Sequence, residues 1–255
     1  MSVRSTHRPG QDPEAAVRPP GPPVRPERPS GCDSRKYPVV IEVETPHGLA
    51  RVRLERGKVG SETEGGGGRL ALVLGHGAGG GVNSTDLRGA TEAAVALGFI
   101  VALIEQPYRV AGRRSPPSAG HLDTAWLAVI GALASGPLAN CRVVVGGRSS
   151  GARVACRTAM QTNAVGVLCL AVPLLPPGAA RRGDASKSRL GELESVPASI
   201  PVLVVQGARD PFGIPPPGAN RSVVTIAGTH TLSSTKTVRE AVSPWLAVLL
   251  AAADR

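Results

Sequence analysis

The chain has 255 residues, enough for one domain of generous size, and its 42% hydrophobic and 19% charged residues allow most of it to bury a core. Only 2% of the residues are aromatic, which excludes nucleic-acid modules that stack bases on aromatic side chains. The net charge of +10 would suit a nucleic acid or an acidic membrane, but no block of five or six like charges occurs, so we expect neither partner.

The first 36 residues are rich in proline, arginine and glycine, as in the stretch RPPGPPVRPERPSG. They contain seven basic and four acidic side chains and few apolar ones. Such a composition cannot bury a core, so residues 1–36 are predicted to be a disordered tail. Its proline-rich part suits an SH3-like partner, although a solvated tail without a partner is the simpler interpretation.

From residue 37 the pattern becomes strand-like. Residues 37–56 contain two β-type runs separated by Thr45-Pro46-His47-Gly48, which is turn chemistry, so a β-hairpin is predicted. His47 then lies in an exposed turn and is not expected to be catalytic. Four glycines, 65–68, follow in a polar loop.

The remaining residues to 255 alternate short apolar runs with segments of helical period, which predicts a mostly parallel sheet flanked by helices. The expected strands are 70–74, 99–104, 142–145, 165–170, 202–205 and 223–226. The expected helices are 87–97, 122–134, 151–161 and about 235–252, the last of them kinked or restarted at Pro244 with Ser243 as a local N-cap.

The four cysteines are Cys32, Cys141, Cys156 and Cys169. They form no C-x-x-C pair and no zinc-like spacing with histidines, so no metal is expected. The amino terminus has no apolar signal segment, and the longest apolar run near the other end, 246–253, is too short to cross a bilayer. A cytoplasmic protein with reduced thiols is therefore expected.

A G-x-S-x-G motif, Gly147-Arg148-Ser149-Ser150-Gly151, lies between the strand-like VVVGG and the helical ARVACRTAM. The motif alone occurs often by chance in a chain this rich in glycine and serine. Its strand–turn–helix context is what a nucleophile elbow requires, because the two glycines permit the tight turn that exposes the serine. Ser149 is therefore the candidate nucleophile.

A serine nucleophile needs a base and an acid. Asp210 follows one expected strand in QGARDPFG, and His230 follows the next in AGTHTLS. Parallel strands bring such loops to one edge, so the set Ser149, Asp210 and His230 predicts a catalytic triad. The alternative acids are Asp123, Asp86 and Glu105; a capping role at a helix start or turn explains the first two more simply.

An acyl-transfer site also needs donors for the oxyanion. Small residues after the first parallel strand, in LGHGAGGG, suit this role. One donor is expected to be the N–H of Ala78 or Gly79 and the other the N–H of Ser150. His76 is expected to orient this loop, and a phosphate-binding turn is disfavoured because no Walker lysine follows.

These motifs resemble the α/β-hydrolase superfamily, and within it the dienelactone-hydrolase-related group of KANL3/Tex30-type hydrolase-like proteins. The similar segments are LGHGAGGG, IEQPYRVAGRRSPP, VVVGGRSSGAR, VVQGARDPFG and AGTHTL, which span residue 70 to the carboxyl end. The resemblance implies an α/β-hydrolase fold with about eight strands and a Ser149–Asp210–His230 triad. Where that group often has GKSMGGR or GRSMGGR, this chain has GRSSGAR.

Substrate contacts are harder to assign. Tyr108 and Arg109 follow a strand at the same edge, with Arg113 and Arg114 nearby, and they either line the substrate entrance and favour an anionic ligand or form a solvated loop. His76 and Arg148 are further candidates for substrate contact. The segment between residues 170 and 202 is too short for a large lid, so an open site is expected.

The sequence therefore predicts a serine hydrolase that cleaves an ester, thioester or similar acyl bond of a small molecule without any cofactor. The alternative is a non-catalytic interaction module that keeps the hydrolase fold. The complete Ser149, Asp210 and His230 set favours the enzyme. A basic nucleic-acid binder, the third interpretation, would show affinity that falls steeply with salt.

Overall fold

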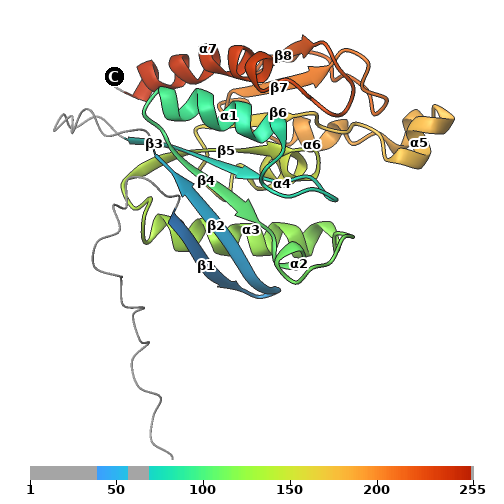
Figure 1. Cartoon of the computed structure of the whole chain (residues 1–255). Helices are drawn as coiled ribbons and strands as arrows, with labels where there is room; N and C mark the ends of the chain where they lie inside the picture. The colour runs from blue at the N-terminus through green and yellow to red at the C-terminus, as the bar shows by residue number, and fades with distance from the viewer. Residues whose placement is uncertain (1–38, 57–68, 254–255) are drawn as a thin grey trace, which may run out of the picture. The chain divides into compact units, whose positions relative to one another are not determined.

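One eight-stranded sheet organises the computed structural model, which describes residues 39–56 and 69–253 (Figure 1). The strands are β1 (Val39–Thr45), β2 (Gly48–Glu55), β3 (Arg69–Gly75), β4 (Ile100–Glu105), β5 (Cys141–Arg148), β6 (Gly166–Leu170), β7 (Val202–Gly207) and β8 (Arg221–Ile226). Their order is β1-β2-β4-β3-β5-β6-β7-β8. The hairpin β1–β2 joins β4 antiparallel, and all later pairs are parallel.

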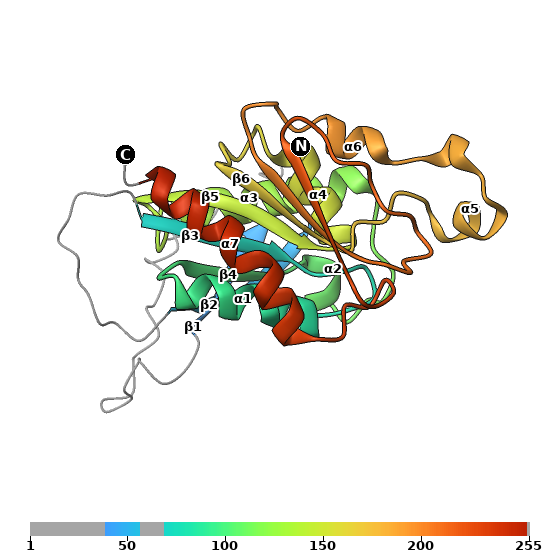
Figure 2. The same ribbon diagram turned by 90° about the horizontal axis from the view of Figure 1, so that it is seen from above.

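Helices cover both faces of this sheet. They are α1 (Thr85–Ala96), α2 (Pro107–Val110), α3 (Ala119–Ala134), α4 (Ser150–Thr158), α5 (Pro177–Arg182), α6 (Leu190–Glu194) and α7 (Thr235–Ala253), with a 3-10 turn η1 (Ala185–Lys187). The long helices α1 and α7 lie together on one face, and α3 and α4 lie on the other (Figure 2).

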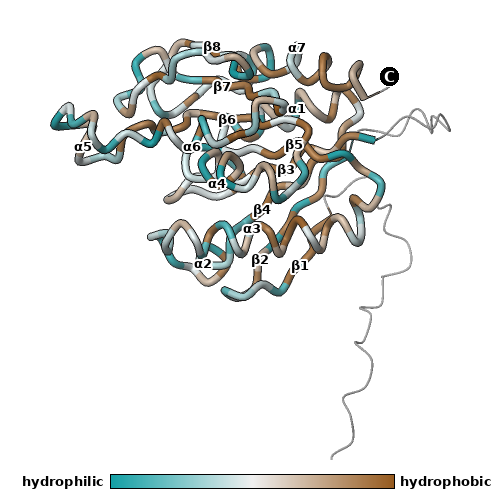
Figure 3. Tube along the Cα trace, turned by 180° about the vertical axis from the view of Figure 1, so that it is seen from behind, coloured by the Kyte–Doolittle hydropathy of each residue, from teal (hydrophilic) through white to brown (hydrophobic). Residues whose placement is uncertain are grey.

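The strand residues alternate between two cores, as the central strand β3 shows. Leu70, Leu72 and Leu74 pack with α1 and α7, whereas Ala71 and Val73 pack with the α3 side, where Trp126 is fully buried. The central strands are the hydrophobic part of the trace in Figure 3, and α5, which extends away from the sheet, is largely hydrophilic. Because these strands are buried on both faces of the sheet, they appear in the sequence as continuous apolar runs.

The strand order reverses direction at β3, because β4 lies on one side of it and β5 on the other. The loops that follow β3, β5, β7 and β8 therefore meet at the carboxyl edge of the sheet, the usual position of ligand sites in such folds. The segment between β6 and β7 contains only the short elements α5, η1 and α6, so no lid domain within residues 39–56 and 69–253 covers this edge.

The carboxyl-terminal helix corrects one local prediction. α7 runs through Pro244 without a new start, and the Ser243 hydroxyl donates to the Arg239 carbonyl oxygen (2.8 Å) instead of capping a second helix. The carbonyl that lacks a helical N–H because of Pro244 is that of Glu240, so the Ser243 hydroxyl, which bonds the Arg239 carbonyl, does not replace the missing hydrogen bond.

The first turn of α3 corrects another prediction. Ser118, not Asp123, is the N-cap and accepts from the His121 N–H. Asp123 instead binds Arg157 of α4 through two hydrogen bonds of 2.6 and 2.8 Å, a contact between helices that a local pattern does not reveal. His47 lies in the β1–β2 turn, where its ring contacts that of His121 edge-on.

The predicted tail (1–36) and glycine loop (65–68) lie outside the described residues.

Candidate active site

Ser149 occupies the turn between β5 and α4. Its backbone has φ 52° and ψ −106°, a conformation that an L-residue adopts only under constraint. The Ser149 N–H donates to the Leu170 carbonyl at the end of β6 (2.9 Å) and thereby fixes the turn to the neighbouring strand. This is the strand–turn–helix geometry that the sequence predicts for the candidate nucleophile.

Three glycines permit β3, β5 and α4 to cross closely below this turn. A Cβ atom on Gly147 would lie 2.5 Å from the Gly75 carbonyl oxygen, and one on Gly151 would overlap the same oxygen. A Cβ on Gly75 itself would lie 3.2 Å from the Trp126 ring. The absence of side chains at these positions therefore brings the elbow directly against the loop that follows β3.

The structure brings Ser149, His230 and Asp210 together in one hydrogen-bonded chain. His230 Nε2 lies 3.0 Å from Ser149 Oγ, and His230 Nδ1 lies 2.9 Å from Asp210 Oδ2. Because an ionised carboxylate only accepts, it selects the tautomer with a proton on Nδ1 and leaves Nε2 to accept from the serine hydroxyl. The arrangement can transfer a proton from Ser149 to His230.

Two residues outside the predicted site, Gln206 and Phe212, support this hydrogen-bonded chain. Gln206, the penultimate residue of β7, donates to Asp210 Oδ2 (2.8 Å) as well as to two backbone carbonyls. Phe212 donates its N–H to Asp210 Oδ1 (2.9 Å) and packs edge-on against the His230 ring, with centroids 4.6 Å apart. No pattern along the sequence marks this support, because it depends on where the Gln206 side chain and the Phe212 N–H point in the folded chain.

The oxyanion candidates lie beside Ser149. A Cβ on Gly77 would lie 3.6 Å from the Ser149 Cβ, so the loop after β3 touches the nucleophile turn. Within the described residues, the N–H groups of Ala78 and Gly79 have no protein acceptor. Ser150 is the first residue of α4, where N–H groups have no intrahelical partner. All three candidates can therefore donate to a ligand.

His76 has no ring nitrogen left for a substrate. Its Nε2 accepts the Gln106 N–H (3.0 Å), and its Nδ1 therefore carries the proton that is donated to the Gly77 carbonyl (2.8 Å). Burial lowers the pKa of His76, which favours this neutral form. The ring thus orients the loop, as expected, and the substrate contact suggested for it does not fit this geometry.

Arg148 also turns into the protein. Its Nε donates to Asp86 Oδ2 (2.8 Å) and one terminal nitrogen donates to the His230 carbonyl (3.3 Å). Asp86 is 2% exposed and thus has a structural partner rather than a merely local turn role. Arg148 therefore connects α1 with the His230 loop, and a substrate contact would fall to its other terminal nitrogen, for which the described structure shows no acceptor.

Tyr108 and Arg109 lie at the start of α2. The Tyr108 hydroxyl donates to the Ala78 carbonyl (2.7 Å), and burial raises the pKa of Tyr108 to about 12. Arg109 is half-buried, and one terminal nitrogen donates to the Arg113 carbonyl (3.1 Å). Of the two, only Arg109 has a terminal guanidinium nitrogen without an acceptor in the described structure; its Nε is buried and has no partner either. Glu105, the remaining alternative acid, lies at the end of β4, 4.0 Å from Arg51.

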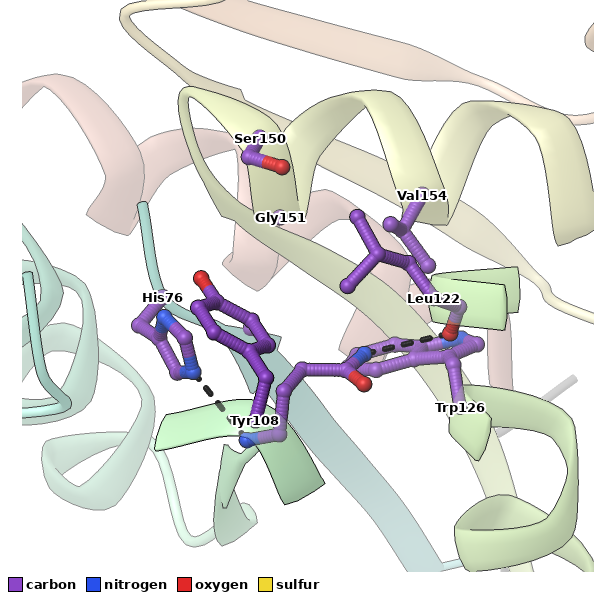
Figure 4. Close-up of a pocket in the computed structure, with 9 residues that line it drawn as sticks. His76, Tyr108, Leu122, Trp126, Ser150, Gly151 and Val154 are labelled. Atoms are coloured by element: carbon purple, nitrogen blue, oxygen red, sulfur yellow. Dashed lines mark hydrogen bonds between the residues drawn. The ribbon is translucent and has the colours of Figure 1, made fainter. Parts of the chain in front are cut away.

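A cavity of about 10 Å³ lies behind the candidate oxyanion loop, between β3, α2, α3 and the start of α4 (Figure 4). His76, Tyr108, Trp126 and Ser150 are among its lining residues. The cavity has room for about one water molecule and is too small to hold an acyl group.

The described part of the chain holds no cluster of three or more side chains suited to a metal ion. None of its helices combines the length and the apolar character that crossing a membrane requires.

Comparisons with solved structures show the same fold. A serine hydrolase without a lid from Xanthomonas campestris matches with a TM-score of 0.61 and 17% identity over 84% of this chain and 95% of that one. Est1E from Butyrivibrio proteoclasticus matches with a TM-score of 0.63 and 16% identity over 83% of this chain and 99% of that one. A dienelactone hydrolase from Anabaena variabilis matches with a TM-score of 0.60 and 18% identity over 84% of this chain and 98% of that one. No curated protein matches the sequence significantly.

A family model described as an alpha/beta hydrolase domain matches residues 68–234, which include Ser149, Asp210 and His230. This region covers more than half of the chain and contains the parallel part of the sheet. The chain therefore belongs to the alpha/beta hydrolase family.

Proposed function

We propose that this protein is a serine hydrolase that cleaves a carboxylic ester or thioester bond, with Ser149 as nucleophile, His230 as general base and acid, and Asp210 as the group that orients His230. The observation that carries the proposal is the continuous contact from Ser149 Oγ through His230 to Asp210, at 3.0 and 2.9 Å. The buried carboxylate accepts three hydrogen bonds, so its position is well defined.

In the proposed reaction, Ser149 Oγ attacks the acyl carbon while its proton moves to His230 Nε2. The negative charge on the carbonyl oxygen is stabilised by the N–H of Ser150 and by that of Ala78 or Gly79. His230 then protonates the leaving oxygen or sulfur, and an acyl group remains on Ser149. Water, activated by His230, releases the acid and restores the serine.

The absence of a lid domain in the described structure favours substrates that bind at the surface of the carboxyl edge. Structural relatives agree with an ester or related acyl bond, since Est1E was also solved with ferulic acid bound and another relative is a dienelactone hydrolase. We extend the proposal to a place among the KANL3/Tex30-type proteins, on the segments LGHGAGGG and GRSSGAR.

Hydrolysis of short p-nitrophenyl esters and of an acyl thioester tests this function. We expect turnover by the wild type and a loss of about 10⁴-fold or more in kcat for Ser149→Ala. Ser222→Ala, on the exposed face of β8, is the matched control and should keep wild-type kinetics. Equal, negligible turnover by folded wild type and Ser149→Ala would overturn the proposal and favour a non-catalytic interaction module.

A further inference from the structure

The candidate oxyanion loop has few restraints of its own. Its only internal backbone hydrogen bond in the described structure joins the Gly80 N–H to the Gly77 carbonyl (3.2 Å). A Cβ atom on Gly79 or Gly81 would meet nothing within 4 Å, so packing does not fix the backbone there. Glycine also tolerates many backbone conformations, which makes rotation of a peptide unit inexpensive in this loop.

Two buried side chains, His76 and Tyr108, supply the missing restraint, one for each of two successive peptide units. Figure 4 shows these two side chains next to each other. His76 Nδ1 donates to the Gly77 carbonyl (2.8 Å), and the Tyr108 hydroxyl donates to the Ala78 carbonyl (2.7 Å). The described chain has no cis peptide bond, so the N–H of each unit points away from its carbonyl. Fixing the Ala78 carbonyl therefore fixes the direction of the Gly79 N–H.

The same strand end fixes both side chains. The Gln106 N–H donates to His76 Nε2 (3.0 Å), and Tyr108 follows two residues later in α2. Tyr108 is 6% exposed, and its raised pKa keeps the hydroxyl protonated, hence a donor, throughout the neutral range. Tyr108 belongs to α2 and not to the loop, so its hydroxyl adds a restraint that the loop's own hydrogen bonds do not provide.

We propose that Tyr108 is a positioning residue of the oxyanion site: its hydroxyl holds the Ala78–Gly79 peptide so that backbone N–H groups, and not the Ala78 carbonyl oxygen, face the developing negative charge. This inference rests on the proposed function. Without the hydroxyl, the unrestrained peptide can rotate and present an oxygen to the oxyanion, which would raise the energy of the transition state more than that of bound substrate.

Tyr108→Phe tests the role because it removes one oxygen and keeps the ring. We expect kcat for an ester substrate to fall about 10- to 100-fold, less than the loss of a whole donor, while KM changes by less than about threefold. Thr162→Val is the matched control. It also removes a buried hydroxyl that donates to backbone carbonyls, but in the turn that follows α4, and it should leave kcat unchanged.

A second readout separates positioning from general destabilisation. An alkyl boronic acid forms a tetrahedral adduct with an active serine, so its affinity should fall with Tyr108→Phe by about the same factor as kcat/KM. Thermal unfolding of both variants, compared with the wild type, shows whether they are folded.

The outcomes separate the two proposals. If the wild type neither turns over nor binds the boronic acid, the proposed function and this inference both fail. If the wild type is active and Tyr108→Phe keeps its kcat and its boronic acid affinity, the serine hydrolase stands and only the role of Tyr108 is wrong. A loss confined to KM, with unchanged kcat, would also overturn the positioning role.

Discussion

At the scale of single residues, the ion pair between Arg148 and Asp86 has the largest consequence. It ties the nucleophile turn to α1, and the contact of Arg148 with the His230 carbonyl (3.3 Å) extends it to the base. The sequence could not reveal this pair, because its members are 62 positions apart and each has a simpler local explanation. Arg148 follows a glycine of the motif, where a substrate contact is an equally natural interpretation.

We expect Arg148→Met to lower the free energy of unfolding by about 3 kcal/mol, because it leaves the buried Asp86 carboxylate without its partner. The double variant Asp86→Asn with Arg148→Met removes both charges and should cost at least about 1 kcal/mol less than the sum of the single variants. Urea denaturation of the four proteins measures this difference. If the losses in unfolding free energy of the two single variants simply add in the double variant, the Arg148–Asp86 pair contributes no coupling energy.

The buried ring of His76 should make the free energy of unfolding depend on pH. Its pKa is lowered by burial, so on acidification below about 6.5 the unfolded chain takes up a proton before the folded chain does. The contribution of neutral His76 is therefore complete above that pH and declines as the pH falls toward the lower folded pKa.

His76→Gln replaces the ring with an amide that has both a donor and an acceptor but does not titrate. The wild type should lose up to about 1.4 kcal/mol more per pH unit than this variant below pH 6.5. Urea denaturation at pH values from 8 to 5 measures the two slopes. Parallel slopes would contradict the assignment of a neutral, buried His76.

At the scale of elements, the crossing of β3, β5 and α4 is the most restrictive feature. Gly151→Ala would place a methyl group against the Gly75 carbonyl, and we expect a loss of at least about 3 kcal/mol in unfolding free energy. Gly131→Ala is the control: an added Cβ there, in the middle of α3, meets nothing within 4 Å. It should stabilise by about 0.5–1 kcal/mol. Thermal unfolding measures the stability of the two variants. If Gly151→Ala and Gly131→Ala change it equally, the close contact between α4 and β3 is wrong.

The strands and long helices could be predicted because each carries a strong pattern. The parallel strands are buried on both faces, and every expected one lies within a few residues of its observed bounds. The short elements α2, α5, η1 and α6 could not be predicted, since six residues or fewer do not establish a helical period. Ser243 and Asp123 were misassigned for a related reason: their partners are set by packing and by Pro244, not by the nearest residues.

At the scale of the whole molecule, the segments that follow β4, β6 and β7 carry a net positive charge of 8 − 5 = +3, because eight basic side chains stand against Asp123, Asp184, Glu192, Glu194 and Asp210. None of the eight basic side chains pairs with a carboxylate within 4.0 Å in the described structure. They are Arg109, Arg113, Arg114, Arg181, Arg182, Lys187, Arg189 and Arg209. Such a distribution raises the local concentration of anions near the candidate site.

A substrate with a negative charge is therefore expected to react faster than a neutral one. The ratio of kcat/KM for p-nitrophenyl succinate monoester to that for p-nitrophenyl butyrate should fall about tenfold between low salt and 0.5 M salt. Replacing Arg109, Arg113 and Arg114 by glutamine should lower the ratio at low salt. Arg142→Gln, at the opposite edge where β5 begins, is the charge-matched control for one replacement. A ratio independent of salt would contradict the steering.

The candidate site was predictable to the extent that it follows from strand order. Ser149, Asp210 and His230 each follow a parallel strand, and topology alone brings those positions together. Gln206, Phe212 and the contact of Tyr108 with Ala78 were not predictable, because they depend on where side chains point after packing. Sequence patterns thus specify which loops meet, and packing decides which side chains support them.

Covalent labelling by a fluorophosphonate, located by peptide mass spectrometry, tests whether Ser149 is an activated nucleophile, because this reagent modifies only a serine that a neighbouring base activates. We expect stoichiometric labelling of the wild type on Ser149 alone, no labelling of Ser149→Ala, and a strong loss of labelling for His230→Gln. A folded wild-type protein that remains unlabelled, or that is labelled on another serine, would contradict this role of Ser149.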